Sequence, residues 1–289
     1  MKYKFIAEHA HEHSVRLMCQ VLGVPRSGYY KFSQGTISQQ EAANVRLLEH
    51  IKTIHRESHG TYGSPRVHQE LKRRGIACGR HRTARLMANA GVVGRAGKRF
   101  RTTTRQRKSA IAAPDLLKRE FTAERPHEVW TSDITYIWTD EGWLYLAVIL
   151  DLCTRAVVGW ATGASIDAAL VCAALHRALT RYRPLEEVVL HSDRGSQYTS
   201  ELFRELLAKQ PMPLEQSNGL SCFDNAVTES FFHTLKTELV SFERYHSREE
   251  AHRSLFEYIE VFYNRNRLHS SIGYIPPMEK LEEYLTKAA

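Results

Sequence analysis

The chain has 289 residues, of which 43% are hydrophobic and 25% charged, and its formal net charge is +8. This length suffices for a sizeable core and predicts two or three modules. No apolar run approaches a membrane span and no signal peptide is recognisable, so we expect a soluble, cytoplasmic protein without a membrane partner. Five scattered cysteines without a Cys-x-x-Cys pair argue against a disulfide framework or a structural zinc site.

The positive charge is concentrated in one segment. Residues 60–109 contain fourteen Lys and Arg residues but only one acid, Glu70. Most charge runs are solvated faces, yet seven of these cations lie within 95–108 with no acid among them. The asymmetry therefore favours a polyanionic partner, and nucleic acid is the best candidate.

The N-terminal region has the pattern of short helices. Residues 14–23 and 24–31 suggest a helix, a glycine turn and a second helix, which is typical of a helix-turn-helix and also of ordinary helical hairpins. We assign this segment to 1–37. A longer helix is expected over 41–55, with a core-facing stripe made of Val45, Leu48, Ile51 and Ile54.

A second pair of helices is expected over 65–74 and 80–89, in a helical DNA-binding domain that spans 38–93. Its packing residues would be Val67, Leu71, Leu86 and Met87. Arg80, Arg82 and Arg85 would face phosphates. Residues 94–124 are predicted to form a basic linker. The linker would add six DNA-binding cations, namely Lys98, Arg99, Arg101, Arg105, Arg107 and Lys108.

From about residue 125 the pattern changes to alternating strands and helices. Strands are predicted over 128–138, 143–151 and 155–162 as an antiparallel meander, followed by strands over 187–192 and 213–216. Helices are predicted over 167–181, over 200–209 and from residue 225. The fold class is therefore α/β, with a core over 125–245 and a helical tail over 246–289.

Three acidic residues are the candidates for chemistry. In the first strand, alternation places Trp130, Ile134, Tyr136 and Trp138 on an apolar face and Asp133 on the other. Asp193 ends an apolar strand, where α/β sheets collect their active sites. Glu229 lies on a helix opposite its apolar stripe, together with Lys236. Convergence of three carboxylates would suit divalent metals and phosphoryl transfer.

Two other acids are weaker candidates. Asp224 stands where the N-cap of the Glu229 helix belongs, so capping is its expected role. Asp151 ends the apolar run 144–150 and is ranked below the other three.

Several motifs, in order along nearly the whole chain, resemble the second-reading-frame (OrfB-type) transposases of the insertion-sequence three family, which are related to retroviral integrases. These motifs are Arg26-Ser-Gly-Tyr-Tyr30, His59-Gly-Thr-Tyr-Gly-Ser-Pro-Arg66, Asp115-Leu-Leu-Lys-Arg-Glu-Phe121, Trp130-Thr-Ser-Asp-Ile-Thr-Tyr136, His191-Ser-Asp-Arg-Gly-Ser-Gln-Tyr198, Asp224-Asn-Ala-Val-Thr-Glu-Ser-Phe-Phe232 and Tyr263-Asn-Arg-Asn-Arg-Leu-His269.

The resemblance implies a ribonuclease-H-like catalytic core, a mixed sheet flanked by helices, with a DDE triad matched by Asp133, Asp193 and Glu229. It also implies two Mg²⁺ ions, replaceable by Mn²⁺, at those carboxylates, which would act as catalytic residues and metal ligands. Lys236 would bind DNA beside them, with Tyr263 and Arg267 as further DNA contacts. The implied partners are the terminal repeats of an insertion element, target DNA, further copies of the chain in a synaptic complex, and the protein of an upstream reading frame. The implied setting is the bacterial cytoplasm and its nucleoid DNA.

The resulting prediction is metal-dependent cleavage at element ends followed by strand transfer into target DNA. Two alternatives remain from the residues alone. One is a DNA-binding regulator of transposition that performs no catalysis. The other is a ribonuclease-H-like nuclease that cuts without joining.

Overall fold

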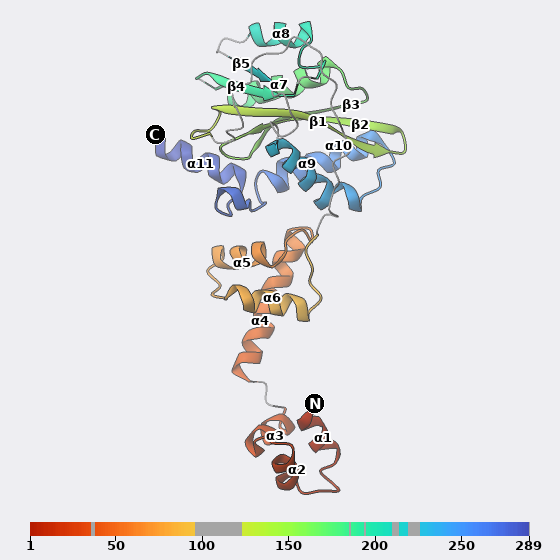
Figure 1. Cartoon of the computed structure of the whole chain (residues 1–289), viewed down its shortest axis with the longest axis vertical. Helices are drawn as coiled ribbons and strands as arrows, with labels where there is room; N and C mark the ends of the chain where they lie inside the picture. Colours follow the sequence, from red (N-terminus) through yellow and green to blue (C-terminus); the bar gives the residue numbers. More distant parts are fainter. Residues whose placement is uncertain are drawn as a thin grey trace.

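The computed structural model describes residues 1–35, 38–95, 123–184, 186–193, 195–209, 214–218 and 226–288. From the N-terminus, Figure 1 shows a three-helix unit, a second helical unit around α4, α5 and α6, and a sheet with helices on both faces. The C-terminal helices lie beneath the sheet, on the side of the second helical unit. Among the described helices, none combines the length and the apolar character needed to cross a bilayer.

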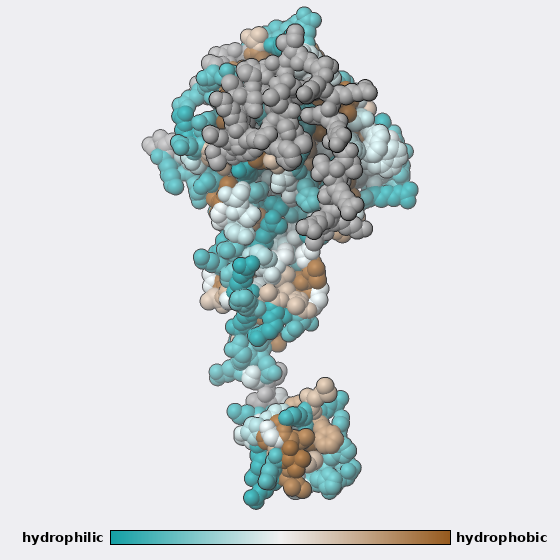
Figure 2. All heavy atoms as spheres, viewed as in Figure 1, coloured by the Kyte–Doolittle hydropathy of each residue, from teal (hydrophilic) through white to brown (hydrophobic). Residues whose placement is uncertain are grey.

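The N-terminal unit consists of α1 (Lys2–Glu8), α2 (Val15–Val21) and α3 (Arg26–Ser33). Sequence analysis predicted the last two helices but missed α1. The unit has its own small core, in which Ile6, Met18, Cys19 and Tyr29 are buried. Its surface shows apolar side chains in Figure 2, in keeping with the exposure of several large apolar residues along these helices.

The second helical unit contains α4 (Gln39–Glu57), α5 (Ser64–Arg73) and α6 (Arg80–Asn89), close to the predicted bounds. Ser38 and Glu41 form a capping box that starts α4. The predicted core residues of α5 and α6 are all buried, as are Ile51 and Ile54 of α4. The prediction for Val45 was wrong, since 59% of it is exposed. The N-terminal turns of α4 extend past α5 and α6 (Figure 1), so neither of these helices covers that face of α4 there.

The sheet has the strand order β3-β2-β1-β4-β5. Strands β1 (Val129–Thr139), β2 (Gly142–Asp151) and β3 (Val157–Gly163) form the predicted antiparallel meander. Strands β4 (Val188–Ser192) and β5 (Leu214–Asn218) then extend the sheet in parallel with β1. The mixed sheet flanked by helices is the predicted ribonuclease-H-like class.

Helices cover both faces of this sheet (Figure 1). On one face, α7 (Ala168–Tyr182) and α8 (Glu201–Ala208) share a core with Trp130, Ile149 and Leu190. On the other face lie α9 (Ala226–Glu238), α10 (Arg248–Phe256) and the π-helical segment η3 (Glu257–Tyr263). The remaining elements are η2 (Val240–Phe242), η4 (Ser270–Ile272) and α11 (Pro277–Ala288).

The alternation along β1 was predicted correctly, but its apolar face is buried only over the first half of the strand. Trp130 is fully buried, whereas 54% of Tyr136 and 57% of Trp138 are exposed. The opposite face, with Thr131, Asp133 and Ile137, turns toward α9 and is mostly buried. Asp133 therefore lies on a covered face of the sheet, because α9 packs where the alternation alone suggested a polar surface.

Candidate active site and nucleic-acid interface

The parallel pairing of β1 with β4 brings two of the predicted acids together. Ser132 is the register partner of Ser192, and an aspartate follows each of them, Asp133 in β1 and Asp193 just after β4. Because parallel strands end at the same edge of a sheet, both aspartates lie side by side at the carboxyl end of the β1–β4 pair. The buried Tyr198 packs next to this edge, with its hydroxyl 2.8 Å from Ser132 Oγ.

Backbone groups hold both aspartates. Asp193 Oδ1 accepts a hydrogen bond from the Gly195 N–H at 2.9 Å, and Asp133 Oδ1 accepts one from the Ile134 N–H at 2.8 Å. A Cβ at position 195 would lie 2.9 Å from Asp193 Oδ1, closer than such contacts normally are. Glycine at this position thus lets the turn fold over the carboxylate.

The third predicted acid, Glu229, lies in the first turn of α9. Its neighbour Thr228 is buried and its Oγ1 lies 2.7 Å from Thr131 Oγ1 of β1. Phe231 and Leu235 are buried one and two turns further along and anchor the helix to the sheet. This packing fixes the start of α9 beside the strand that carries Asp133, while Glu229 itself remains exposed.

The pKa values of Asp133, Glu229 and Lys236 are shifted by burial, and those of Asp133 and Lys236 also by neighbouring charges. Burial raises the pKa of Asp133 to about 7, and the negative charges of Asp193 and Glu229 raise it further, while the Ile134 N–H and the Lys236 ammonium oppose the shift. Burial also raises the pKa of Glu229. Burial lowers the pKa of Lys236, against the attraction of Asp133. The three acids and the lysine therefore form one electrostatic cluster.

A divalent cation fits the chemistry of this cluster. Carboxylates held together against their own repulsion are stabilised by a cation, and oxygen ligands are those that Mg²⁺ prefers. Within the described part of the chain, however, no three or more His, Cys, Asp or Glu side chains stand close enough to hold a metal ion. The acids are thus neighbours without forming a closed ligand set.

The two weaker acidic candidates have different outcomes. Asp151 is fully buried and accepts hydrogen bonds from the backbone N–H groups of His127 and Thr154, both at 2.7 Å. It is also the register partner of Trp130, at the end of β1 away from Asp193, so it stabilises a turn. Asp224 lies outside the described residues.

The predicted DNA-binding cations are only partly described. Arg80 and Arg85 are exposed on α6, as a phosphate contact requires. Arg82 is half-buried, and its Nε donates to Asn44 Oδ1 at 3.0 Å, so a structural bond already engages it. The six predicted linker cations lie outside the described residues; they are Lys98, Arg99, Arg101, Arg105, Arg107 and Lys108.

Tyr263 and Arg267, which were predicted to contact DNA, are buried in the protein. Only 1% of Tyr263 and 3% of Arg267 are exposed. Arg267 donates from Nε and Nη2 to the two carboxylate oxygens of Glu238, both at 2.7 Å. Tyr258 donates to Glu238 Oε2 at 2.8 Å. Arginine in a motif fits a phosphate or a buried carboxylate equally well, and only the packing distinguishes the two.

Glu238 also joins the helical unit to the α/β core, a role that sequence analysis missed. Arg66 of α5 places Nη1 3.5 Å from Glu238 Oε1 and donates from Nε to the Leu268 carbonyl at 3.1 Å. Tyr62 donates to the Asn266 carbonyl and accepts from the Leu268 N–H, at 3.1 and 2.7 Å. Because Glu238 ends the helix that carries Glu229 and Lys236, these contacts connect the helical unit to that helix.

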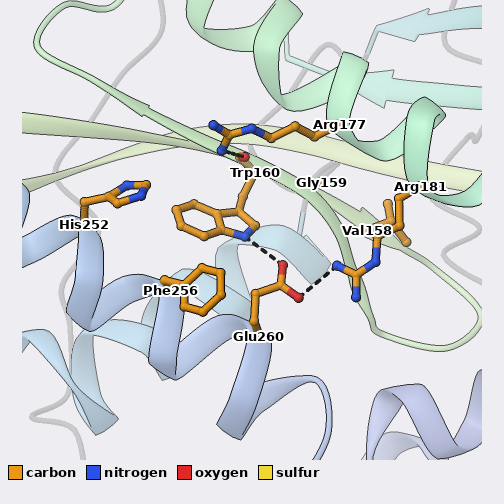
Figure 3. A pocket seen from close by; sticks show the side chains of 8 residues that line it. All are labelled: Val158, Gly159, Trp160, Arg177, Arg181, His252, Phe256 and Glu260. Atoms are coloured by element: carbon orange, nitrogen blue, oxygen red, sulfur yellow. Dashed lines mark hydrogen bonds and ion pairs between the residues drawn. The ribbon is translucent and has the colours of Figure 1, made fainter.

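A pocket of about 320 Å³ lies apart from the acidic cluster, beside β3, α7 and α10 (Figure 3). Trp160 donates to Glu260 Oε1 at 3.0 Å, and Arg181 donates to Glu260 Oε2 at 2.8 Å. Arg177 donates to the Trp160 carbonyl at 2.8 Å. The polar groups that line the pocket are therefore largely paired with one another, and none of the three predicted acids lines the pocket.

Comparison with known families matches the described architecture. Residues 42–100 match the model of an HTH-like domain, and residues 123–213 and 229–283 match two models of an integrase core domain. An HTH-like domain joined to an integrase core defines a DNA-recombining polynucleotidyl transferase.

Individual relatives cover almost the whole chain. It is 41% identical over 272 residues to an uncharacterized 31 kDa protein of insertion element IS600 from Shigella sonnei, covering 94% of this chain and 100% of that protein. It is 38% identical over 279 residues to transposase InsF for insertion sequence IS3A from Escherichia coli strain K12, covering 96% and 97%. The chain belongs to this IS3 family of DNA transposases.

Solved structures are more distant. The simian T-cell lymphotropic virus intasome in complex with PP2A regulatory subunit B56 gamma aligns with a TM-score of 0.45 and 12% identity, over 80% of this chain and 74% of that chain. The catalytic core domain of BIV integrase aligns with a TM-score of 0.42 and 20% identity, over 56% and 99%.

Proposed function

We propose that the chain cleaves DNA at the ends of an insertion element and joins those ends to target DNA, with Asp133, Asp193 and Glu229 as its catalytic residues and metal ligands. The observation that carries this proposal is the β1–β4 register, which sets Asp133 beside Asp193 at one sheet edge. The effect of the Asp193 and Glu229 carboxylates on the pKa of Asp133 supports it.

The chain's own residues would perform three tasks in this reaction. The carboxylates would hold two Mg²⁺ ions, or Mn²⁺ in their place, with Glu229 completing the set from α9. Bound there, the ions supply activation of the attacking hydroxyl and stabilisation of the leaving oxygen. Lys236 would contact the phosphate beside Asp133, and Arg80 and Arg85 of α6 would hold the duplex further away.

The test uses labelled duplexes that carry an element end, with Mg²⁺ or Mn²⁺. We expect Asp133→Asn, Asp193→Asn and Glu229→Gln each to abolish cleavage while DNA affinity stays largely unchanged. Asp151→Asn is not a suitable control because Asp151 is buried, but Glu201→Gln changes an exposed carboxylate at the start of α8 and should leave cleavage intact. Metal-dependent cleavage by any of the three triad variants would refute the assignment.

Assays of binding, cleavage and joining with the same labelled duplexes distinguish two alternative functions. A wild-type chain that binds ends but never cuts them would be a regulator of transposition. A chain that cuts but does not join a cleaved end to a second duplex would be a nuclease. Synapsis of two ends requires at least two copies of the chain. A requirement for fusion to an upstream-frame protein is tested by comparing cleavage by the chain alone with cleavage by a form extended by that protein.

A further inference from the structure

Three aromatic side chains remain exposed at the far end of the β1–β2 hairpin. The exposed fractions are 54% for Tyr136, 57% for Trp138 and 42% for Trp143. Trp143 meets the other two rings edge to face, with centroid distances of 5.0 Å to Tyr136 and 4.8 Å to Trp138. Trp138 and Trp143 are direct cross-strand partners, so two paired strands hold the cluster in place.

These rings continue a face of the sheet that is buried elsewhere. Ile134 and Tyr145, on the same face, are partly buried against the core beneath α7 and α8. Beyond them the aromatic side chains of the hairpin are exposed, so no helix of the described residues covers them. Strand β4 pairs with β1 only over Val129–Ser132, so in the described part of the chain the edge of β1 past that point has no strand beside it. The aromatic cluster therefore borders an open edge rather than a filled interior.

The cluster also adjoins the acidic site. Tyr136 lies three residues after Asp133 and therefore on the opposite face of β1, but the Lys236 ammonium, which belongs to the acidic cluster, lies 4.9 Å from the centroid of the Tyr136 ring. Arg248 donates from Nε to the Trp143 carbonyl at 3.0 Å. Arg244, with a side chain 79% exposed, lies 3.5 Å from Asp140. Exposed rings with the Lys236 ammonium beside one of them suit a ligand with flat apolar faces and negative charge.

We propose that Tyr136, Trp138 and Trp143 form a stacking site for unpaired bases of the DNA strand whose phosphodiester lies at the carboxylates. The proposal rests on the proposed function for the position of that phosphodiester. Bases inside a duplex already stack on one another, so an aromatic side chain can meet a base face only where the strand has left the duplex. Stacking of this kind tolerates any sequence because every base has a π-face, and Lys236 would hold the adjoining phosphate.

The experiment compares two labelled DNA probes in a chelator, where no cleavage occurs. One is a fully paired duplex and the other is the same duplex with several unpaired nucleotides at one end. Threonine replaces each tryptophan because it is well tolerated in strands. We expect Trp138→Thr and Trp143→Thr each to weaken binding of the splayed probe about tenfold and binding of the paired probe by less than about twofold. Phe256→Ala, which removes a ring of 52% exposure on α10, is the matched control and should change neither.

A second readout uses the wild-type protein alone. A 2-aminopurine placed among the unpaired nucleotides should lose fluorescence on binding, because ring stacking quenches it. The inference is refuted by an unchanged 2-aminopurine signal. It is equally refuted if the tryptophan variants lose the same affinity for both probes. It is also refuted if the tryptophan variants change the oligomeric state instead, since the occupant would then be a second copy of the chain. Absence of cleavage in Mg²⁺ by both the wild-type chain and its extended form overturns the proposed function and leaves the chelator measurements standing. Intact cleavage without a preference for splayed ends overturns only the stacking site.

Discussion

Replacing Arg267 by methionine should destabilise the catalytic core strongly. Glu238 and Arg267 have side chains only 5% and 3% exposed and are joined by two hydrogen bonds of 2.7 Å. Without the guanidinium, Glu238 keeps only Tyr258 and the more distant Arg66 as side-chain partners among the described residues. Removal of one partner from a buried ion pair costs about 3–5 kcal/mol, so the free energy of unfolding should fall by about that amount.

Urea unfolding followed by tryptophan fluorescence measures this loss, because all four tryptophans lie between residues 130 and 160. The matched control is Arg253→Met, which breaks an exposed pair with Glu249 whose side chains are 76% and 66% exposed. That change should cost less than about 1 kcal/mol. The double variant Glu238→Leu/Arg267→Met removes both charges and should recover part of the loss.

The reasoning fails if Arg267→Met loses no more stability than Arg253→Met. It also fails if the stability loss of the double variant equals the sum of the losses of Glu238→Leu and Arg267→Met measured singly, because the two side chains would then not interact. In either case the buried pair would not hold the end of α9, and a DNA-binding role for Arg267 would regain support.

Four further outcomes follow from the described contacts. Burial gives Asp133 a folded pKa of about 7, above its ordinary 3.8, so its stabilising contribution is complete below about pH 4 and is lost as the pH rises through 7. In metal-free buffer the Tm of Asp133→Asn should therefore rise relative to the Tm of the wild type between pH 4 and 8. A Tm difference that does not change with pH would contradict this. Arg85→Ala should weaken binding to all duplexes alike and reduce the salt slope of the affinity by about 1, whereas an unchanged slope would mean that α6 does not contact phosphate. Deletion of 1–37 should leave the Tm of the remaining chain unchanged, because the core of α1 to α3 is separate; a clear drop in scanning calorimetry would reveal a shared core. Gly159→Ala would place a Cβ 2.4 Å from the Ala174 carbonyl oxygen of α7 and should cost about 1–3 kcal/mol in urea unfolding, and a neutral result would show that α7 can move away from β3.

Local patterns in the sequence were enough for most elements. The meander of β1 to β3 and the helices α4 to α7 follow from hydrophobic periodicity and turn residues, which act over a few neighbouring positions. The short helix α1 was missed because seven residues carry little periodic signal. Val45 was misplaced because periodicity identifies an apolar stripe but does not show how far a partner helix extends.

The sequence by itself determined which residues are candidates for chemistry, since an aspartate at a strand end and a glutamate on a helix are recognisable from local pattern and family motif. Only the tertiary structure decided what surrounds them. The β1–β4 register set Asp133 beside Asp193, and the packing of α9 covered the face on which Asp133 lies. The packing of α9 also buried Arg267 against Glu238. On the other face of the sheet, Tyr136, Trp138 and Trp143 stayed exposed. Burial and pairing depend on residues that are distant in sequence, and one chain read locally does not specify which of them meet.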